Sequence, residues 1–187
     1  MTERYRFLFS GSGGQGVITM GILLAEAAVL HDGLNAVQTQ SYGPEARGGA
    51  TRCDVIVSSG PIHFPKVIQP NVLIALTQEA CSRYLPLLRP GGLLVSDTRF
   101  VTTGKRVDAS LKALPLYETL MERIGKAQSF NICVLGAVNH FTKLVRMSSL
   151  EKVLESRFTP VFHETNRAAL YLGEELAASL EGDGGNL

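Results

Sequence analysis

The sequence has little of what marks secreted, membrane-bound or nucleic-acid-binding proteins. Its 18 basic and 17 acidic residues leave a formal net charge of +1, so charge gives no reason to expect nucleic acid or a membrane surface as a partner. No apolar run reaches the roughly 18 residues that a membrane span needs. The residues Met1–Arg4 lead directly into a predicted strand and do not resemble a signal peptide. These absences predict a cytoplasmic protein that binds neither nucleic acid nor membrane.

Cysteine is also scarce, and the arrangement of the few that are present excludes several kinds of site. Cys53, Cys81 and Cys133 are scattered without a C-x-x-C pair. We therefore expect no cysteine-ligated iron–sulfur cluster and no structural zinc site within this chain alone. The four histidines share no ligand spacing, and no serine lies in a Gly-x-Ser-x-Gly motif. The sequence therefore predicts no metal-binding residue and no catalytic residue.

The patterns that are present predict an α/β protein. A chain of 187 residues with 45% hydrophobic content is expected to form one domain, over residues 1–180, followed by a disordered tail at 181–187. Short apolar strands alternate with helical patterns, which is typical of a parallel sheet covered by helices. We predict a three-layer α/β/α, Rossmann-like fold with a mostly parallel sheet.

The boundaries of the expected elements follow from periodicity and turn residues. Residues 5–9, 16–31 and 34–40 are expected to form a right-handed unit of strand, helix and parallel strand. The segments 51–58 and 62–64 flank a Ser-Gly-Pro turn and predict an antiparallel hairpin at an edge of the sheet. The continuous apolar run at 71–76 predicts a strand buried on both faces, 93–96 predicts another buried strand, and a short strand is expected at 106–109. Further helices are expected with Thr77 as the N-cap, over 115–124, over 131–145, with Ser148 or Ser149 as the N-cap, and over 162–180.

A glycine-rich loop after the first strand is the strongest local signal. Gly11, Gly13 and Gly16 match G-x-G-x-x-G directly after a strand and at the opening of a helix. Such a loop presents free N–H groups and the positive end of the helix dipole to an anion, usually a phosphate. Alternatively, it is a turn that lets the helix pack on the sheet and binds nothing. The spacing alone leaves both interpretations open.

Two common phosphate ligands are disfavoured by the residues around this loop. A loop for nucleoside triphosphates ends in Gly-Lys-Ser/Thr, whereas this one ends in Gly16-Val17-Ile18. A dinucleotide site needs an acid at the end of the second strand to bind the ribose, and that strand ends in Gln38-Thr39-Gln40. Asp32 lies at the opposite end of the strand. Ordinary NAD binding is therefore a minor alternative.

The segment that follows the second strand, residues 41–50, is the second informative stretch. Its glycines and its proline predict a loop beside the glycine-rich loop, where ligands bind in open α/β sheets. Arg47 has a fixed fork of donors that suits a phosphate or a carboxylate. Ser41, Tyr42 and Glu45 accompany it. The alternative is an exposed surface loop whose Glu–Arg pair contributes little.

Together, residues 11–17 (GSGGQGV) and 40–49 (QSYGPEARGG) resemble the gamma subunit of the 2-oxoacid:ferredoxin oxidoreductases. The resemblance extends over about residues 5–180, and the second motif is closer to the 2-oxoglutarate branch than to the pyruvate branch. It implies an accessory subunit of a complex that converts a 2-oxoacid and coenzyme A to an acyl-CoA and carbon dioxide. Thiamine diphosphate would be bound by the alpha and beta subunits. Electrons would leave through iron–sulfur clusters on partner subunits, including a ferredoxin-like one.

The resemblance also suggests what the two loops contact. This chain would bind no cofactor alone but would help to bind coenzyme A or to close the site that coenzyme A enters. Gly13, Gly14, Gln15 and Gly16 are expected to hold a phosphate, Tyr42 and Glu45 to orient the ligand, and Arg47 to make a charge contact. The complete set of predicted binding residues is Gly11, Gly13, Gly14, Gln15, Gly16, Ser41, Tyr42, Glu45 and Arg47.

Two alternatives remain open at this point. One is an independent nucleotide-binding dehydrogenase, which the missing ribose acid disfavours. The other is a purely structural subunit whose glycine loop packs against the catalytic subunits and contacts no ligand. The sequence does not identify the 2-oxoacid, because groups that contact the substrate would lie on other chains.

Overall fold

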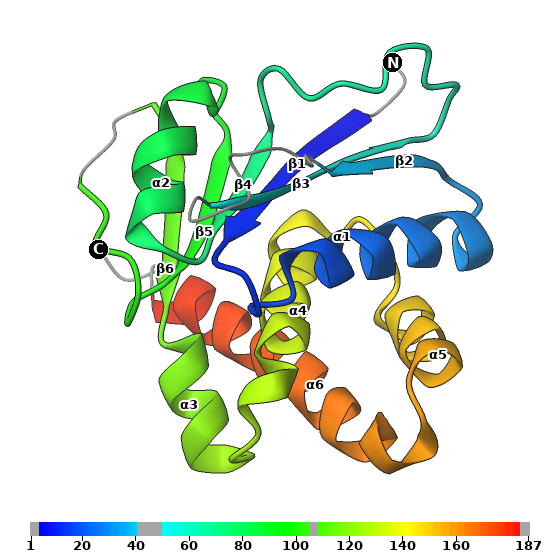
Figure 1. Ribbon diagram of the computed structural model, residues 1–187, viewed down its shortest axis with the longest axis vertical. Coiled ribbons are helices and arrows are strands. Elements are labelled where there is room, and N and C mark those ends of the chain that lie inside the picture. Colours follow the sequence, from blue (N-terminus) through cyan, green and yellow to red (C-terminus); the bar gives the residue numbers. More distant parts are fainter. Residues whose placement is uncertain (1–3, 41–49, 105–107, 184–187) are drawn as a thin grey trace.

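A six-stranded sheet forms the centre of the computed structural model, which describes residues 4–40, 50–104 and 108–183 (Figure 1). The strand order is β2-β3-β1-β4-β5-β6. The pairs β1–β4, β4–β5 and β5–β6 are parallel, whereas β3 runs antiparallel to both of its neighbours, β1 and β2. Five of these six strands therefore point the same way. The strands are β1 (Arg4–Gly11), β2 (Asn35–Gln40), β3 (Thr51–Ser58), β4 (Val72–Ala75), β5 (Leu93–Asp97) and β6 (Ser110–Leu114).

The position of β3 differs from the prediction. The predicted antiparallel hairpin at a sheet edge is present but is formed by β2 and β3; the pairing predicted between 51–58 and 62–64 is wrong, because 61–64 contain no strand. The predicted unit of strand, helix and parallel strand is present, since β2 runs parallel to β1, but β3 lies between the two strands. The physical reason lies in Val55, Ile56 and Val57, three consecutive side chains that are at most 1% exposed. A strand that is apolar on both faces is buried on both faces, so it occupies the sheet interior.

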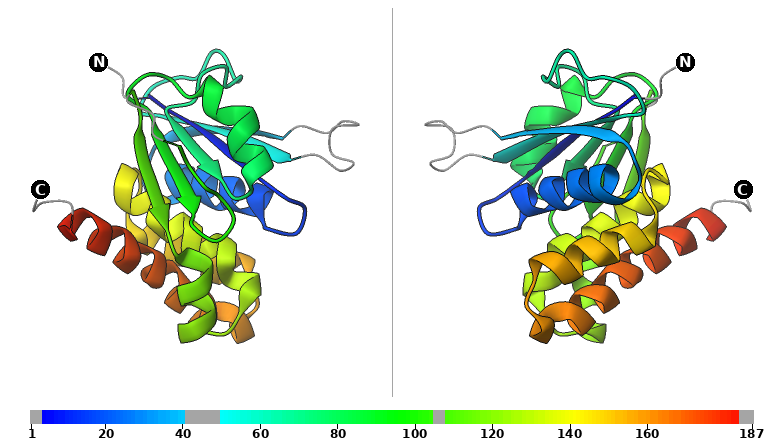
Figure 2. Two further views of the ribbon diagram at one scale, coloured as in Figure 1. Left: turned by 90° about the vertical axis from the view of Figure 1, so that its left-hand side faces the viewer. Right: turned by 90° about the vertical axis from the view of Figure 1, so that its right-hand side faces the viewer.

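Helices cover both faces of the sheet unequally, which confirms the predicted α/β class (Figures 1 and 2). Helix α2 packs on one face with a small apolar cluster, and the other five helices pack on the opposite face with a larger one. In the described part of the chain, no helix combines the length and the apolar character that a bilayer crossing demands. The helices are α1 (Val17–Glu26, continued as a π-helical turn over Ala27–His31), α2 (Gln78–Tyr84), α3 (Leu116–Arg123), α4 (Phe130–Thr142), α5 (Met147–Arg157) and α6 (His163–Asp183).

Helix α4 is the buried centre of the larger layer. All ten residues from Phe130 to Asn139 are buried, as expected for a helix that is apolar on every side. Helix α6 crosses α4 at very close range through two glycines. A Cβ atom added to Gly136 would collide with the carbonyl oxygen of Leu170, and one added to Gly173 would collide with that of Cys133. The crossing therefore excludes any larger residue at these two positions unless the helices move apart.

Three further elements differ in detail from the sequence expectation. The strand expected at 106–109 is β6, which begins at Ser110, while 105–107 lie outside the described residues. Helix α6 continues to Asp183, so residues 181–183 are helical rather than part of a disordered tail. Neither Ser148 nor Ser149 caps α5, whose N-cap is Arg146.

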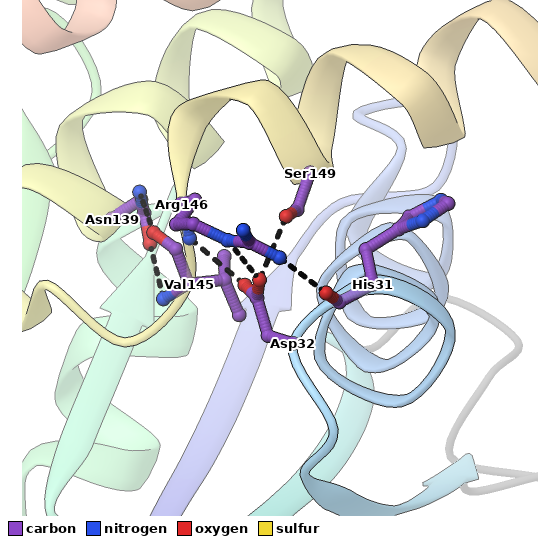
Figure 3. A network of polar contacts seen from close by, with 6 residues as sticks. All are labelled: His31, Asp32, Asn139, Val145, Arg146 and Ser149. Carbon is purple, nitrogen blue, oxygen red and sulfur yellow. Dashed lines mark hydrogen bonds and ion pairs between the residues drawn. The ribbon is translucent and has the colours of Figure 1, made fainter.

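Asp32, which lies far away in the sequence, binds the first residues of α5 in place of a serine cap (Figure 3). Its carboxylate accepts hydrogen bonds from the Arg146 backbone N–H (2.9 Å), from Arg146 Nε (2.6 Å) and from Ser149 Oγ (2.8 Å). Burial acts to raise the pKa of Asp32, but these bonds outweigh it and lower the pKa below its usual value. Asp32 thus joins the end of the first helix to α5, at the sheet edge opposite to the glycine loop.

Candidate functional site

The glycine-rich loop connects β1 to α1 with two residues in the left-handed region. Gly14 has φ 89° and Gly16, the N-cap of α1, has φ 68°. Residues with a side chain rarely adopt these conformations, so glycine at both positions is required by the turn. The predicted loop between a strand and a helix is confirmed.

The four glycines of the loop divide into a packed pair and an open pair. A Cβ on Gly11 would lie 3.1 Å from Cβ of Leu76, at the end of β4, and 3.2 Å from Cγ2 of Val17. A Cβ on Gly16 would lie 2.7 Å from Cγ of Asn131. At Gly13 and Gly14, by contrast, no atom of the described chain lies within 4 Å of an added Cβ. The outer half of the loop therefore faces space that a ligand or a partner can occupy.

Gln15 holds the loop in shape. Its Oε1 accepts a hydrogen bond from the Ser12 backbone N–H at 2.7 Å, and its Nε2 donates to the carbonyl oxygen of Leu76 at 3.1 Å. Both ends of the carboxamide are thus engaged within the protein, and one loop N–H is satisfied by it. Gln15 therefore acts first as a brace between the loop and β4, and its direct contact with an anion stays a prediction.

The amino end of α1 has no internal compensation for its dipole. No side chain of the described residues caps it, and no acidic residue lies in its first turn. The first intrahelical bond runs from the Met20 N–H to the carbonyl oxygen of Gly16, so the N–H groups that precede Met20 point out of the helix end. This end is electropositive and suits an anion.

A cavity of about 590 Å³ opens in front of this helix end. Its wall brings together segments that are far apart in the sequence: the glycine loop, the segment after β5, the start of α3, the start of α4 and the start of α6. The amino ends of α1 and α4 both contribute to it. The lining residues are Gly14, Gln15, Gly16, Thr19, Arg99, Phe100, Tyr117, Ala127, Gln128, Phe130, Asn131, Ile132, Phe158, Phe162 and Asn166.

Polar donors in this wall add to the electropositive helix ends. Asn166, which is 4% exposed, accepts a hydrogen bond on Oδ1 from Ser129 Oγ at 3.0 Å, whereas its Nδ2 has no partner among the described residues. Buried amide groups normally have partners, so this enclosed, unpaired donor is an unusual feature of the wall. Arg99 lies beside the cavity with a half-exposed side chain, 3.7 Å from the carboxylate of Glu118.

The apolar side of the cavity is aromatic. Phe100, Tyr117 and Phe130 contact one another edge to face, with ring centroids 5.2 to 5.9 Å apart. The guanidinium of Arg99 lies 5.3 Å from the centre of the Tyr117 ring, a cation–π distance. The cavity therefore combines a cationic and N–H-rich side with an aromatic side.

Asp97 positions this part of the wall. It is fully buried at the end of β5, and it accepts hydrogen bonds from the backbone N–H groups of Arg99 (2.8 Å) and Tyr117 (2.7 Å). Burial raises the pKa of Asp97, in opposition to these bonds. Because both bonds go to backbone groups, Asp97 fixes the path of the chain at the point from which the Arg99 side chain reaches the cavity wall.

The second half of the predicted site lies outside the described residues. Ser41, Tyr42, Glu45 and Arg47 all fall within 41–49, and their proposed roles stay predictions. Gln40 and Thr51, on either side of this segment, can be placed. Thr51 pairs with Gly11, and Gln40 pairs with Cys53. The strands that flank the segment therefore end at the same sheet edge as the glycine loop.

Sequence reasoning missed Arg99, Asn131 and Asn166. Arg99 could have been found, because it follows a buried strand at the carboxyl edge of a parallel sheet, where ligands bind. Asn131 is an isolated polar residue at the start of an apolar helix, which is a weaker signal. No local pattern marks Asn166.

The described residues offer no reactive cysteine and no metal centre. Cys53, Cys81 and Cys133 are all buried. Desolvation raises the pKa of Cys53 to about 11 and that of Cys133 to about 12, so neither is a thiolate near neutral pH. Within 4–40, 50–104 and 108–183, no three His, Cys, Asp or Glu side chains come together as a metal site would require.

Comparisons with known proteins agree on one family. Residues 6–176 match the model of the pyruvate ferredoxin/flavodoxin oxidoreductase family. The chain is 40% identical to 2-oxoglutarate synthase subunit KorC of Methanocaldococcus jannaschii over 179 residues, which is 95% of this chain and 96% of that one.

Two solved structures share the fold. The gamma subunit of a keto/oxoacid ferredoxin oxidoreductase from Geobacter sulfurreducens has a TM-score of 0.87 and 41% identity, over 95% of this chain and 98% of that chain. The 2-oxoglutarate:ferredoxin oxidoreductase of Magnetococcus marinus, with 2-oxoglutarate, coenzyme A and succinyl-CoA bound, has a TM-score of 0.84. At 22% identity, and with 31% of that longer chain covered, it shows a common fold alone.

Proposed function

Because the chain belongs to the pyruvate ferredoxin/flavodoxin oxidoreductase family, we propose that its glycine loop and the adjoining cavity hold a phosphate of coenzyme A within an assembled oxidoreductase. The chain is an accessory, gamma-type subunit of a ferredoxin oxidoreductase complex. We assign 2-oxoglutarate as the oxoacid, on the similarity to 2-oxoglutarate synthase subunits. Thiamine diphosphate and the iron–sulfur clusters are assigned to partner subunits, of alpha, beta and ferredoxin-like type.

The uncapped amino end of α1 beside two open glycines is the observation that carries this proposal. A phosphate placed there would accept hydrogen bonds from the N–H groups at the start of α1, which no side chain of the described residues caps, next to the positive end of the helix dipole. The half-exposed Arg99 supplies a further donor on the same cavity wall. Coenzyme A carries both phosphates and an aromatic base, and the cavity offers a donor-rich side and an aromatic side.

The fold weighs against the dehydrogenase alternative. In a dinucleotide-binding sheet the second strand lies beside the first and carries an acid to the ribose. Here β3 occupies that place, running in the opposite direction, and β2 lies one strand further away and ends in Gln40. Neither the strand order nor the sequence therefore provides an acid where the ribose would lie.

A purely structural role remains the second candidate, and Gln15 is the observation that favours it. Its side chain already satisfies the Ser12 N–H, so part of the loop's donor capacity is used within the chain. The open faces of Gly13 and Gly14 would then accommodate the surface of a catalytic subunit instead of a ligand.

Calorimetric titration of the assembled complex with coenzyme A distinguishes the two. Gly13→Asp would place a carboxylate in the space where a phosphate is proposed, and Gly13→Asn is the neutral control of the same shape, since an added Cβ meets no atom of the described residues there. We expect coenzyme A to bind at least about tenfold more weakly to the Asp variant than to the Asn variant, because like charges repel strongly at contact distance. Arg47→Ala should weaken binding as well.

Equal affinities in the Asp, Asn and Arg47→Ala variants, each in an intact complex, would refute the coenzyme A contact. Loss of assembly in both Gly13 variants, with unchanged affinity in the complexes that do form, would support the structural role. A change in NADH fluorescence on mixing with the purified chain would instead favour a dehydrogenase.

A further inference from the structure

A second polar hollow lies at the opposite edge of the sheet from the glycine loop. It has a volume of about 580 Å³ and is formed where β1 begins, by the segment that precedes β4 and by the turn that precedes β5. These are the amino ends of three parallel strands, whereas the glycine loop lies at their carboxyl ends. We call it the basic groove and define it by Arg6, Phe64, Lys66, Ile68, Gln69 and Arg89.

The basic groove carries three cations and no acid. Arg6, Lys66 and Arg89 come from three separate segments, and none of them forms an ion pair with another described residue. Elsewhere in the described chain, bidentate arginine–carboxylate contacts are common, as in Arg123–Glu175 and Arg157–Glu26. Gathering like charges without a counter-charge raises the free energy of the folded chain, and an anionic partner would remove that penalty.

Apolar side chains are exposed between these cations. Phe64 is 52% exposed and Ile68 is 67% exposed, and they flank Lys66 in the sequence. Large exposed apolar residues that stand next to charges are typical of protein contact surfaces, in which aromatic residues and arginine contribute most. A free phosphate or another small anion would gain nothing from Phe64 and Ile68.

The groove is held in a fixed shape. Asn71 exchanges hydrogen bonds with the backbone of Arg6, at 2.9 Å through its side chain and 2.8 Å through its N–H. The carbonyl oxygen of Pro61 accepts from Arg4 Nη2 at 2.8 Å, and that of Val67 accepts from Arg52 Nη2 at 2.9 Å. A segment tied down at both ends loses little conformational freedom when a partner binds.

We propose that the basic groove binds a carboxylate-rich segment of a partner subunit, with an apolar side chain of that segment seated between Phe64 and Ile68. The two arginines suit bidentate contacts with carboxylates, and Lys66 adds a point charge. No helix begins in the groove, so the backbone donors that recognise a phosphate at the other edge are missing here. Ligand contact and subunit attachment thus occupy opposite edges of one sheet.

Zero-length carbodiimide coupling in the assembled complex tests this contact directly, since it joins an amine only to a carboxylate that touches it. We expect Lys66 to be coupled to an Asp or Glu of a partner subunit. Lys152, an exposed residue of α5, is the control for general reactivity. Absence of a Lys66 cross-link to a partner would overturn the proposal.

Charge reversal gives an independent measurement. The double variant Lys66→Glu/Arg89→Glu should bind the partner subunits at least about tenfold more weakly at low salt, and the deficit should shrink at high salt as the charges are screened. Lys126→Glu/Lys152→Glu changes the net charge equally at exposed positions outside the groove and should bind as the parent does. Equal affinities of the two double variants would overturn the proposal.

The remaining possibility is that the basic groove binds a small anion, and titration of the free chain with ADP and with inorganic phosphate tests it. Binding of either that is lost in Lys66→Glu/Arg89→Glu would make the groove a small-ligand site and would overturn the proposal. Coenzyme A affinity, measured in the same complexes, is expected to be unchanged by this variant. Failure of the groove proposal is therefore distinguishable from failure of the coenzyme A proposal.

Discussion

The close crossing of α4 and α6 leads to the sharpest prediction about stability. Gly136 and Gly173 each face a backbone carbonyl of the other helix, so that a single added methyl group in Gly136→Ala or Gly173→Ala has no room. A rotating side chain could give way to a methyl group, but a helix backbone cannot do so without moving the whole helix. The buried length of α4 makes such a movement costly.

The magnitude follows from two opposing terms. Overpacking a core costs about 1–3 kcal/mol, and we take the upper end because the obstacle is backbone. Alanine is a better helix former than glycine by about 1 kcal/mol, which offsets part of the loss. The net destabilisation expected for each variant is therefore about 2 kcal/mol, which corresponds to a fall in Tm of roughly 4–8 °C for a chain of this size.

Urea unfolding, followed by circular dichroism, measures this, with Gly182→Ala as the matched control. Gly182 also lies in α6, but an added Cβ there meets no atom, so this variant should gain about 0.5 kcal/mol from helix propensity alone. The double variant Gly136→Ala/Gly173→Ala should lose less than the sum of the single losses, because one separation of the helices relieves both collisions. The close-packed crossing would be refuted if each single variant lost less free energy of unfolding than a surface substitution does. It would also be refuted if the losses of the two single variants added exactly in the double variant.

Three further predictions concern the loop, the α5 anchor and the thiols. Gly14→Ala and Gly16→Ala both force alanine into the left-handed region, but only the second also meets Asn131, so in urea unfolding it should be the more destabilising by at least about 1 kcal/mol. Asp32→Asn should lower the free energy of unfolding by about 1–2 kcal/mol at pH 7. Because the pKa of Asp32 is lowered in the folded chain, its stabilisation is present above the unfolded value of 3.8 and disappears as the pH falls through the folded pKa. The stabilities of parent and variant, measured by unfolding at acid pH, should therefore converge, and a constant difference would contradict the role of the charge. Cys53, Cys81 and Cys133 should not react with a thiol reagent in native buffer at pH 8, because they are buried and their pKa values are raised, and they should react in urea. Fast labelling of the native chain would show that the core opens.

The elements that local patterns determine were predictable from the sequence. The glycine spacing located the turn between β1 and α1, and Thr77 was correctly expected to cap α2, where its Oγ1 accepts from the Ala80 N–H at 3.2 Å. The apolar runs of β4 and β5 were also recognised as strands buried on both faces. In each case the deciding interactions lie within a few residues.

The pairing of β3 could not be predicted in the same way. Its partners are set by register across distant segments, such as Phe7 with Val55 and Val37 with Ile56, and both a hairpin toward 62–64 and one toward β2 satisfy the local turn signals. The choice depends on which arrangement buries Val55, Ile56 and Val57 on two faces, which is a property of the whole sheet. The same reasoning explains Asp32, whose partners Arg146 and Ser149 lie more than a hundred residues away.

The cavity could not be predicted either, because its shape depends on α4, which is distant in the sequence from the glycine-rich loop. Asn131, at the start of α4, fills the space beside Gly16 and thereby fixes where the loop turns into α1. Ser129 and Asn166 join the start of α4 to α6, at the same cavity wall. The glycine crossing, one to two turns further along α4, locks the two helices together. Apart from Arg99, the cavity wall is thus built on the most buried part of the chain. The N–H groups at the start of α1 are held in place by this packing, which is the condition under which fixed N–H groups bind negative charge most strongly.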